Sequence, residues 1–410
     1  MSTGEVFLHT AQAFLPRLVE LRRDFHRHPE LSNAEHRTQA RVADELRGLG
    51  VEVQTGVGGT GVVGVLDPTG EAAGESRGGA GSPRPCVALR ADMDALPIQE
   101  ENDVPYRSQV PGVMHACGHD FHMAALLGAA MLLAARREAL PGPVKFIFQP
   151  SEETVSGARR MIEDGVLDAP PVDAIFGFHN VPLLPAGQVA LKEGPTMAAV
   201  DTVHIDVVGA GGHGGIPQRT VDPIVAASAL VLALQTVVSR GVDPLEAAVV
   251  TIGSFQAGTA SNIIPDRAQL AGTVRTFNPA VRDLAEAAIR RVAEGTAAAF
   301  GARAEVRYER VVPAVRNEAV MTRIARQAAA GLLGDEAIRE AQMTTGGEDF
   351  ALFLERVPGC YLSIGSGDPE GGPVAPWHSS RYQVNESALA VAAAVMARTA
   401  LLALKELRRA

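Results

Sequence analysis

The densest group of chemically active side chains lies between Met114 and His122, directly before a helical stretch. It holds three histidines, one cysteine and one aspartate. Cys117 and His119 are two residues apart, so both can reach one site, and a thiolate with an imidazole is a typical transition-metal ligand set. Asp120 is suited to cap the following helix or to hold an imidazole in one tautomer. A helix cap with incidental histidines would not explain so many ligand-type residues, so we expect a metal site.

A pair of adjacent carboxylates, Glu152 and Glu153, follows the apolar run 146–148. Taken alone, such a pair is more often a solvated acidic turn at the start of a helix. Adjacent side chains cannot easily do the same job, so a functional pair would have one glutamate on a metal and the other acting as general base.

Two other apolar runs also lead into ligand-type residues. The run 174–178 leads directly into His179, and the run 86–90 leads to Asp92 and Asp94. In open α/β sheets the active site lies beyond the carboxyl ends of the strands. This convergence favours the functional interpretation of the two glutamates.

Two later histidines lie in glycine-rich or proline-rich segments. His378 follows Trp377 in a loop, where a lone histidine is usually just exposed. His213 is surrounded by five glycines within residues 209–217, which would let the backbone approach a ligand closely. That segment lacks the Lys-Ser/Thr of a phosphate loop and the strand–helix context of a dinucleotide fingerprint, so phosphate binding is not expected.

The hydrophobic pattern indicates how these residues are positioned. Short apolar runs alternate with helical stretches, which argues for an α/β domain with a mostly parallel sheet. The spacer 69–85, rich in Gly, Ser, Ala and Pro, is expected to be a surface loop. The expected strands are 61–66, 86–90, 144–148, 174–178 and 361–364, and the expected helices are two surface helices within 14–50, split near His28, and one over 122–137.

The pattern changes within residues 187–311 to strand, helix, strand, strand, helix, strand, which is the ferredoxin-like order. These elements are expected at 202–208, 222–240, 247–255, 268–276, 279–300 and 304–310. Such a sheet has an exposed edge at which a second copy can pair. We therefore expect residues 187–311 to form an inserted lid and dimerisation domain, and residues 1–186 and 312–410 to form the α/β domain.

Composition excludes several classes of function. The chain has 410 residues with 37 Lys and Arg against 47 Asp and Glu, a net charge of −10, which disfavours a nucleic-acid or anionic-membrane partner. The first thirty residues hold no uninterrupted apolar stretch, so no signal peptide or membrane span is expected and the cytoplasm is the default location. Three widely spaced cysteines disfavour a disulfide framework, and Cys86 and Cys360 are expected to be buried core thiols.

Seven motifs in order resemble the aminoacylase-type metallo-amidohydrolases, in particular the branch with hippurate hydrolases and indole-acetyl-amino-acid hydrolases. The resemblance runs from about Phe25 to Glu386. The motifs are Arg90–Pro97, His115–His122, Phe148–Glu153, His179-Asn180, Gly211–Gly214, Ser261–Asp266 and Gly347–Ala351.

The resemblance implies a metallopeptidase-like catalytic domain with two divalent metal ions and Glu152 as general base. By that resemblance, the metal ligands are Cys117, His119, Glu153, His179 and His378. The cysteine takes the metal-bridging place that an aspartate fills in related peptidases. Thiolate and imidazole favour zinc, and the resemblance also allows manganese, with cobalt or nickel as further options.

The resemblance also implies substrate contacts from the lid. By that resemblance His213, Asn262 and Arg275 contact the substrate, and His213 reaches the neighbouring subunit's site. A guanidinium fork matches a carboxylate with two parallel hydrogen bonds, so Arg275 is expected to bind the substrate carboxylate with help from Asn262.

The expected activity is hydrolysis of the amide bond of N-acyl amino acids to a carboxylic acid and a free amino acid, in a homodimer that binds this small molecule. A dipeptidase or carboxypeptidase of the same architecture is an alternative, because its substrate also presents an amide beside a free carboxylate. A non-catalytic metal-binding protein is another. Retention of Glu152 counts against the latter, since a pure binding site needs no second glutamate.

Overall fold

The computed structural model describes residues 3–69, 84–372 and 374–409. The chain divides into two compact units. The larger unit comprises Met1–Gly194, Arg316–Gln342 and Asp349–Ala410, and the smaller unit comprises Pro195–Val315 and Met343–Glu348. The smaller unit therefore begins eight residues later than the lid expected from the sequence and includes a short segment from after the insertion. Most of the expected surface loop 69–85 lies outside the described residues.

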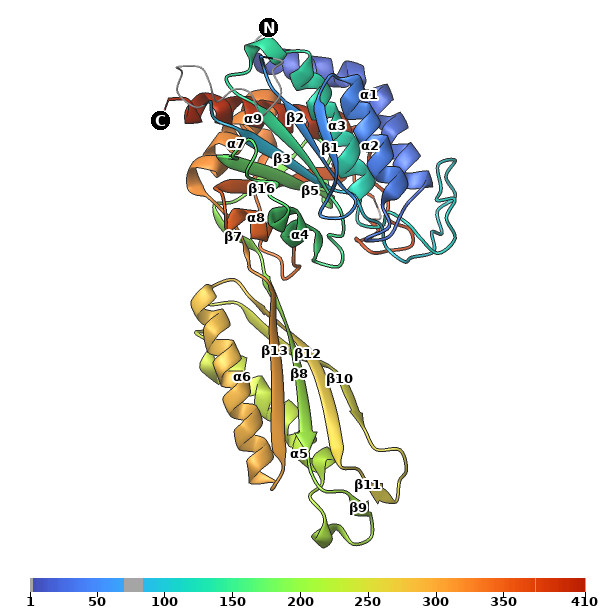
Figure 1. The fold of residues 1–410 in the computed structure, drawn as a ribbon, viewed down its shortest axis with the longest axis vertical. Helices are drawn as coiled ribbons and strands as arrows, with labels where there is room; N and C mark the ends of the chain where they lie inside the picture. Colours follow the sequence, from blue (N-terminus) through green and yellow to red (C-terminus); the bar gives the residue numbers. More distant parts are fainter. Residues whose placement is uncertain (1–2, 70–83, 373, 410) are drawn as a thin grey trace. The chain divides into compact units, whose positions relative to one another are not determined.

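The larger unit is built around an eight-stranded sheet of order β1-β2-β4-β3-β5-β16-β6-β15 (Figure 1). The four central strands β4, β3, β5 and β16 are mutually parallel, so the expected mostly parallel sheet is confirmed. The strands are β1 (Glu52–Val57), β2 (Gly61–Leu66), β3 (Val87–Asp92), β4 (Val144–Gln149), β5 (Ala174–Pro185), β6 (Val189–Leu191), β15 (Ile338–Glu340) and β16 (Gly359–Gly367).

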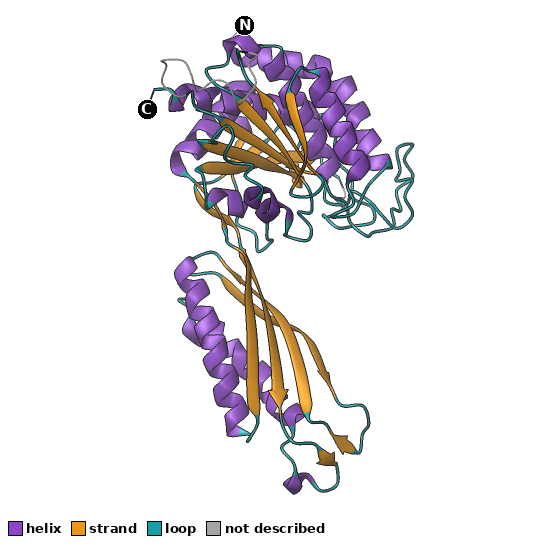
Figure 2. Ribbon diagram, viewed as in Figure 1, coloured by secondary structure: helices purple, strands orange, loops and turns teal. Residues whose placement is uncertain are grey.

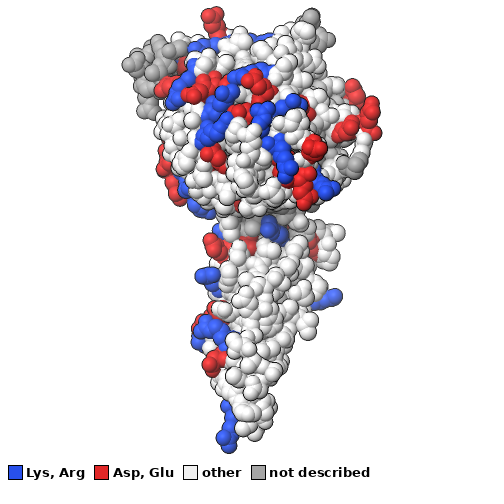
Figure 3. Space-filling view, turned by 90° about the vertical axis from the view of Figure 1, so that its right-hand side faces the viewer, with Lys and Arg blue, Asp and Glu red and all other residues white. Residues whose placement is uncertain are grey.

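Helices pack against one another and against this sheet. Buried apolar side chains along almost all of α3 and α9 explain why these two helices lie in the core, where α1 packs on both of them. The helices of this unit are α1 (Thr3–Arg27), α2 (His36–Gly48), α3 (His119–Ala134), α4 (Gly157–Glu163), α7 (Ala319–Leu333), α8 (Ala351–Leu354) and α9 (Ala388–Leu407), with the 3₁₀ turns η1 (Arg137–Ala139) and η3 (Asp335–Ala337). On the face shown in Figure 3, basic and acidic side chains are interspersed over the larger unit.

One strand extends further than its apolar run predicts. β5 was expected to end at Phe178, but it continues to Pro185, and His179 lies within it, paired in register with Ser363 of β16. Backbone pairing with β16 carries the strand past the two polar residues His179 and Asn180, of which Asn180 is fully buried, so the strand does not end where the first apolar run ends.

The smaller unit is a four-stranded antiparallel sheet of order β10-β12-β8-β13 with two helices on one face, as Figure 2 shows. This confirms the element order read from the sequence. Its strands are β8 (Ala199–Val208), β10 (Ala248–Ala257), β12 (Arg267–Thr276) and β13 (Arg303–Val312), and its helices are α5 (Pro223–Gly241) and α6 (Pro279–Ala299). Short additions are η2 (Pro217–Arg219) and the pair β9 (Gly212–His213) with β11 (Ile263–Ile264). A further two-stranded sheet joins β7 (Gly194–Met197) to β14 (Val315–Asn317).

Both helices of the smaller unit begin with the same N-cap arrangement. The side chain of Asp222 accepts a hydrogen bond from the N–H of Ile224 at 2.8 Å, and that of Asn278 accepts one from Ala280 at 3.0 Å. A proline follows each cap, at the first helical position, where its missing N–H costs nothing.

Among the residues that the structure describes, two helices, α5 and α9, are long and apolar enough to cross a membrane by length and composition. α9 is mostly buried inside the larger unit. α5 packs one face on the sheet of the smaller unit and leaves apolar residues exposed on the other, including Leu232, which is 74% exposed.

Candidate metal centre

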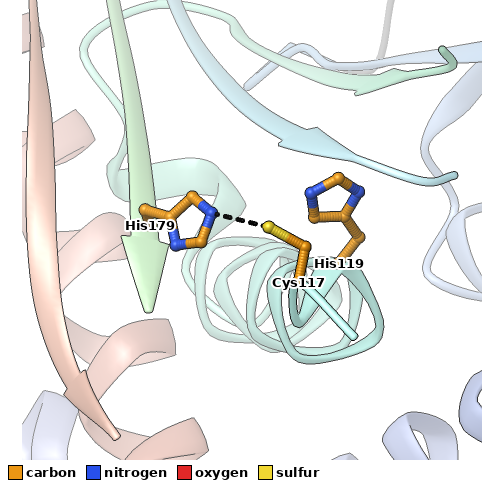
Figure 4. A group of neighbouring side chains, drawn as sticks. All are labelled: Cys117, His119 and His179. Carbon is orange, nitrogen blue, oxygen red and sulfur yellow. Dashed lines mark hydrogen bonds between the residues drawn. The ribbon is translucent and has the colours of Figure 1, made fainter. Parts of the chain in front are cut away.

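All six residues expected at the metal site belong to the larger unit, and the structure brings them together. Cys117 precedes α3 and His119 is its first residue, while Glu152 and Glu153 follow β4. The remaining two, His179 and His378, lie within β5 and in the loop after β16. Figure 4 shows the Cys117 side chain between the imidazoles of His119 and His179.

Cys117 is common to two groups of ligand atoms. Its sulfur lies 3.4 Å from Nε2 of His179, and these atoms form a group with a ring nitrogen of His119 in which all ligand atoms are within 4.8 Å of one another. A second group, equally compact, joins Cys117 to Glu153 and His378. Nε2 of His378 lies 3.6 Å from Oε2 of Glu153. The arrangement therefore offers two adjacent places for a cation that share one sulfur.

The two histidines nearest the sulfur are held in the tautomer that a metal needs. Nδ1 of His119 donates to the main-chain oxygen of Asp94, and Nδ1 of His179 donates to that of Asn180, both at 2.8 Å. Each hydrogen bond leaves Nε2 as the nitrogen that can present a lone pair.

Two buried polar atoms in this cluster have no hydrogen-bond partner among the described residues, namely Nε2 of His119 and Oε1 of Glu153. These atoms lie 3.9 Å apart. Buried polar atoms are nearly always paired, so an orphaned nitrogen and an orphaned carboxylate oxygen facing each other fit a metal ion as their missing partner.

The electrostatics of the cluster also favour a cation. Burial raises the pKa of Glu153 to about 7 and raises the pKa of the Cys117 thiol well above its usual value, with the neighbouring carboxylates adding to the latter effect. Burial lowers the pKa of His119, but the charges of Asp92 and Asp94 outweigh it and hold that pKa well above its ordinary value. A positive charge is thus stabilised at this place, and a divalent cation would offset the cost of ionising the thiol.

Glu152 lies beside the ligands. Its Oε2 is 4.0 Å from Nε2 of His119, and the residue is 8% exposed. It shares a group of ligand atoms with His119 and Glu153 but is in neither group that contains Cys117. A mostly buried carboxylate beside a ligand cluster is placed to exchange protons with a water held by the cluster.

Sequence reasoning counted Asp92 among the ligand-type residues at strand ends but did not identify the buried network that it forms beside this cluster. Nδ1 of His122 donates to Asp92 at 2.6 Å, and the main-chain N–H of Asn180 donates to Nε2 of the same ring at 3.0 Å. Asp92 also accepts a hydrogen bond from Arg90 at 2.7 Å and lies 3.7 Å from Nε2 of His119. The signal that could have identified it is a charged pair, Arg90 and Asp92, at the end of an otherwise apolar strand.

The three residues expected to contact substrate from the lid fall into two places within the smaller unit. His213 on β9 pairs in register with Ile263, and the main-chain oxygen of Asn262 accepts a hydrogen bond from the N–H of Gly214 at 2.8 Å. His213 and Asn262 are therefore neighbours, and both are exposed.

Arg275 lies near the other end of the same sheet. It pairs with Val200 and Val249 near the last residue of β12, whereas Asn262 and β11 precede the first residue of that strand. Eight residues of strand separate Arg267 from Arg275, which corresponds to about 27 Å. Within one chain these two residues lie too far apart to share one carboxylate, so the help of Asn262 to Arg275 stays a prediction that would need a second subunit.

Comparisons with known proteins agree with this site. Residues 88–402 match the model of peptidase family M20/M25/M40. The chain is 44% identical over 403 residues to the N-acetylcysteine deacetylase of Bacillus subtilis, covering 97% of this chain and 99% of the relative. It is 40% identical over 394 residues to the IAA-amino acid hydrolase ILR1-like 2 of Arabidopsis thaliana, with coverages of 95% and 85%.

Another relative, thermostable carboxypeptidase 2 of Saccharolobus solfataricus, is 40% identical over 380 residues, with 92% of each chain covered. A solved Bacillus subtilis structure, described as a dinuclear metal binding peptidase of the M20 family, matches with a TM-score of 0.82 at 41% identity and covers 96% of this chain and 99% of its own. These matches confirm the resemblance drawn from the seven motifs. The chain belongs to peptidase family M20/M25/M40 and is a metal-dependent hydrolase of amide bonds.

Proposed function

We propose that the chain hydrolyses N-acyl amino acids at the amide bond, releasing a carboxylic acid and a free amino acid. The observation that carries the proposal is the different grouping of two adjacent glutamates. Glu153 shares a ligand group with Cys117 and His378, whereas Glu152 is in neither group that contains Cys117 and meets the cluster only in a group with His119 and Glu153. The names of the deacetylase and of the IAA-amino acid hydrolase support an acyl amino acid as substrate.

The site would hold two divalent ions. Zinc or manganese is the preferred metal, and cobalt or nickel is the alternative. Cys117, His119, Glu153, His179 and His378 would bind them, with the shared sulfur of Cys117 between the two places. When bound, two such ions lower the pKa of a shared water and polarise the substrate carbonyl.

Glu152 then moves the proton. Its carboxylate accepts a proton from the attacking water and passes it to the departing amide nitrogen, so that the amine leaves in neutral form. Nε2 of His119 is 4.0 Å from this carboxylate, so a water held at the ligand cluster would lie within hydrogen-bond reach of Glu152.

Arg275 is proposed to bind the free carboxylate of the substrate. It is half-buried, and its Nε donates to Thr273 at 3.1 Å, which orients the guanidinium. His213 and Asn262 are proposed to serve the site of a second subunit, with His213 donating to the developing oxyanion. The smaller unit would thus act as a lid and as the dimerisation unit, and the larger unit would be catalytic.

The two edges of the smaller sheet differ in a way that supports a homodimer. β10 carries no charged residue and exposes Val249 and Phe255, whereas β13 is rich in arginine and glutamate. Charge on an edge strand prevents pairing, so the uncharged edge is the one open to a second copy. The view in Figure 3, toward the side that bears β10, shows few charged side chains over the middle of this unit.

We propose a cytoplasmic location because the three cysteines form no disulfide bond. Cys86, Cys117 and Cys360 are all free and buried, which suits a reducing compartment.

The test is turnover of purified protein, with Zn²⁺ or Mn²⁺ added, on a panel of N-acetyl, N-benzoyl and indole-acetyl amino acids. Peptides with a free carboxyl terminus serve as the competing class, because one relative is named a carboxypeptidase. Faster turnover of acyl amino acids supports the proposal, while faster turnover of peptides favours the carboxypeptidase alternative. Glu152→Gln protein is the control for contaminating activity.

A further inference from the structure

A cavity of about 840 Å³, open to solvent, lies in the larger unit at the carboxyl ends of β5 and β16. Its walls come from three segments, which are the end of β5, the end of β16 with the turn after it, and the loop that carries His378. Pockets that hold small organic ligands have volumes in this range. The proposed mechanism gives this cavity no role.

Two of the three wall segments lead directly to metal ligands. Pro182 is three residues after His179, and Ala375 is three residues before His378. Three residues of chain span at most about 11 Å, so the main chain of the cavity wall lies within that distance of both ligands. Trp377 joins the two places. Its ring packs edge-on to that of His179 with 5.2 Å between the centroids, and its Nε1 donates to a main-chain oxygen of β5 at 3.1 Å.

Two exposed apolar side chains line the cavity. Leu183 is 78% exposed and Val374 is 40% exposed, and they belong to different wall segments. In the described part of the larger unit, the other large apolar side chains with such exposure are Leu31 and Val320. Exposed apolar side chains that gather beside a cavity, instead of lying singly on the surface, indicate a place where an apolar group binds.

The charges at this cavity disfavour an anion. Asp368 and Glu370 line it, and its basic side chain among the described residues, Arg381, donates from Nε to Glu101 at 3.0 Å. A substrate carboxylate would meet an acidic surroundings here, whereas an uncharged apolar group would not be repelled. The cavity therefore suits the end of a substrate that lies away from its free carboxylate.

We propose that this cavity binds the acyl group of the substrate and selects apolar acyl groups larger than acetyl. The inference rests on the proposed function and adds the class of acyl group to it. An acetyl group ends one carbon beyond the amide carbonyl, so it cannot extend from the metal ligands to Leu183 and Val374. A longer alkyl or aryl group can, and it then buries apolar surface against both walls.

The experiment compares kcat/KM for N-octanoyl-alanine and N-acetyl-alanine in Zn²⁺-loaded wild-type and Leu183→Asp protein. Burial of one methylene group favours binding by up to about fourfold, so wild-type protein should prefer the octanoyl substrate by at least roughly tenfold. An aspartate beside an apolar chain is unfavourable, so Leu183→Asp should reduce this preference by roughly five- to twentyfold and leave kcat/KM for the acetyl substrate within about twofold. A wild-type preference for the acetyl substrate, or an unchanged ratio in Leu183→Asp, would overturn the proposal.

Val374→Asp tests the opposite wall, and Val320→Asp is its matched control. Val320 lies at the start of α7, does not line the cavity and has a similar exposure of 37%. The preference for octanoyl should fall in Val374→Asp and stay at the wild-type value in Val320→Asp. Elemental analysis of each variant separates this effect from loss of metal. An equal fall in both variants would mean that the cavity does not select the acyl group.

Binding can be measured apart from turnover. Trp377 is the only tryptophan of the chain, so its fluorescence reports on ligands beside the cavity. In metal-loaded Glu152→Gln protein, N-octanoyl-alanine should bind with a Kd roughly tenfold below that of N-acetyl-alanine, and adding Leu183→Asp should remove the difference. Equal Kd values would overturn the proposal. If the difference is found but wild-type protein hydrolyses no N-acyl amino acid, the proposed function fails while the apolar site stands.

Discussion

His213 and Arg275 belong to the same small unit but lie near opposite ends of its four-stranded sheet: Arg275 is about 27 Å along β12 from Arg267, the first residue of that strand, and His213 pairs with Ile263, which precedes it. Two side chains at that separation cannot hold one small substrate within a single chain. If both contact substrate, one of them must serve the site of a second subunit.

This relationship predicts complementation between inactive variants. His213→Ala and Glu152→Gln dimers should each be inactive. A mixed dimer would contain one site with its own Glu152 intact and the partner's His213 intact. After subunit exchange in an equal mixture, about a quarter of the wild-type kcat should return. Absence of recovery, with exchange verified by mass spectrometry, would place His213 in its own subunit's site or outside the chemistry.

A second prediction separates the two adjacent glutamates. Glu152→Gln keeps the size of the side chain but removes the base, so kcat should fall by about 10²- to 10⁴-fold while metal content stays near that of wild type. Glu153→Gln should lose metal first, because Glu153 lies in a ligand group with Cys117 and His378. Elemental analysis beside steady-state kinetics is the measurement. Equal metal loss in both variants would contradict separate roles.

Much of the architecture could be predicted from local patterns. Apolar runs located the central strands, and the Asp-Pro and Asn-Pro pairs at residues 222 and 278 cap the two helices of the smaller unit. The candidate ligands could be predicted because Cys117, His119 and Glu153 lie at strand ends and helix starts that parallel pairing brings to one edge.

The supporting contacts could not be predicted in the same way. Asp94 and Glu152 are 58 residues apart, and the hydrogen bond between them depends on how the ends of β3 and β4 pair and on the turn at Ser151. The separation of Asn262 from Arg275 likewise depends on the register of β8, β11 and β12. Hydrophobic periodicity and composition predict the structure of single segments, whereas these contacts and separations depend on how different segments pair.

A third prediction concerns Gly118, the residue before α3. Its φ is +93°, and a Cβ built there would lie 2.7 Å from the hydroxyl of Tyr382 and would also clash with the amide of Asn180. Gly118→Ala should therefore lower the free energy of unfolding by about 1–3 kcal/mol and weaken metal binding, because Cys117 and His119 flank the position. Thermal unfolding of metal-free protein and metal titration are the measurements.

Gly112→Ala is the control for this effect. Gly112 has a similar φ of +75°, but nothing lies within 4 Å of its added Cβ. It should show only the cost of the backbone conformation, roughly 1 kcal/mol, with metal binding unchanged. Equal effects of the two substitutions on metal affinity would mean that the close approach of Asn180 and Tyr382 to Gly118 does not shape the site.

The fourth prediction concerns the substrate carboxylate. Arg275 is half-buried in the second strand of the sheet, and burial lowers the pKa of its guanidinium because it disfavours the charged form. A bound anion would stabilise that charged form again. Arg275→Met keeps the apolar stem and removes the charge. A hydrogen bond to a charged group contributes about 1.5–3 kcal/mol, so kcat/KM for N-acyl amino acids should fall by roughly ten- to a hundredfold. The carboxamides of the same substrates lack the anion and should lose little. Equal losses on both substrate types, or a wild-type preference for the carboxamide, would remove Arg275 as the carboxylate contact and favour a different class of amide.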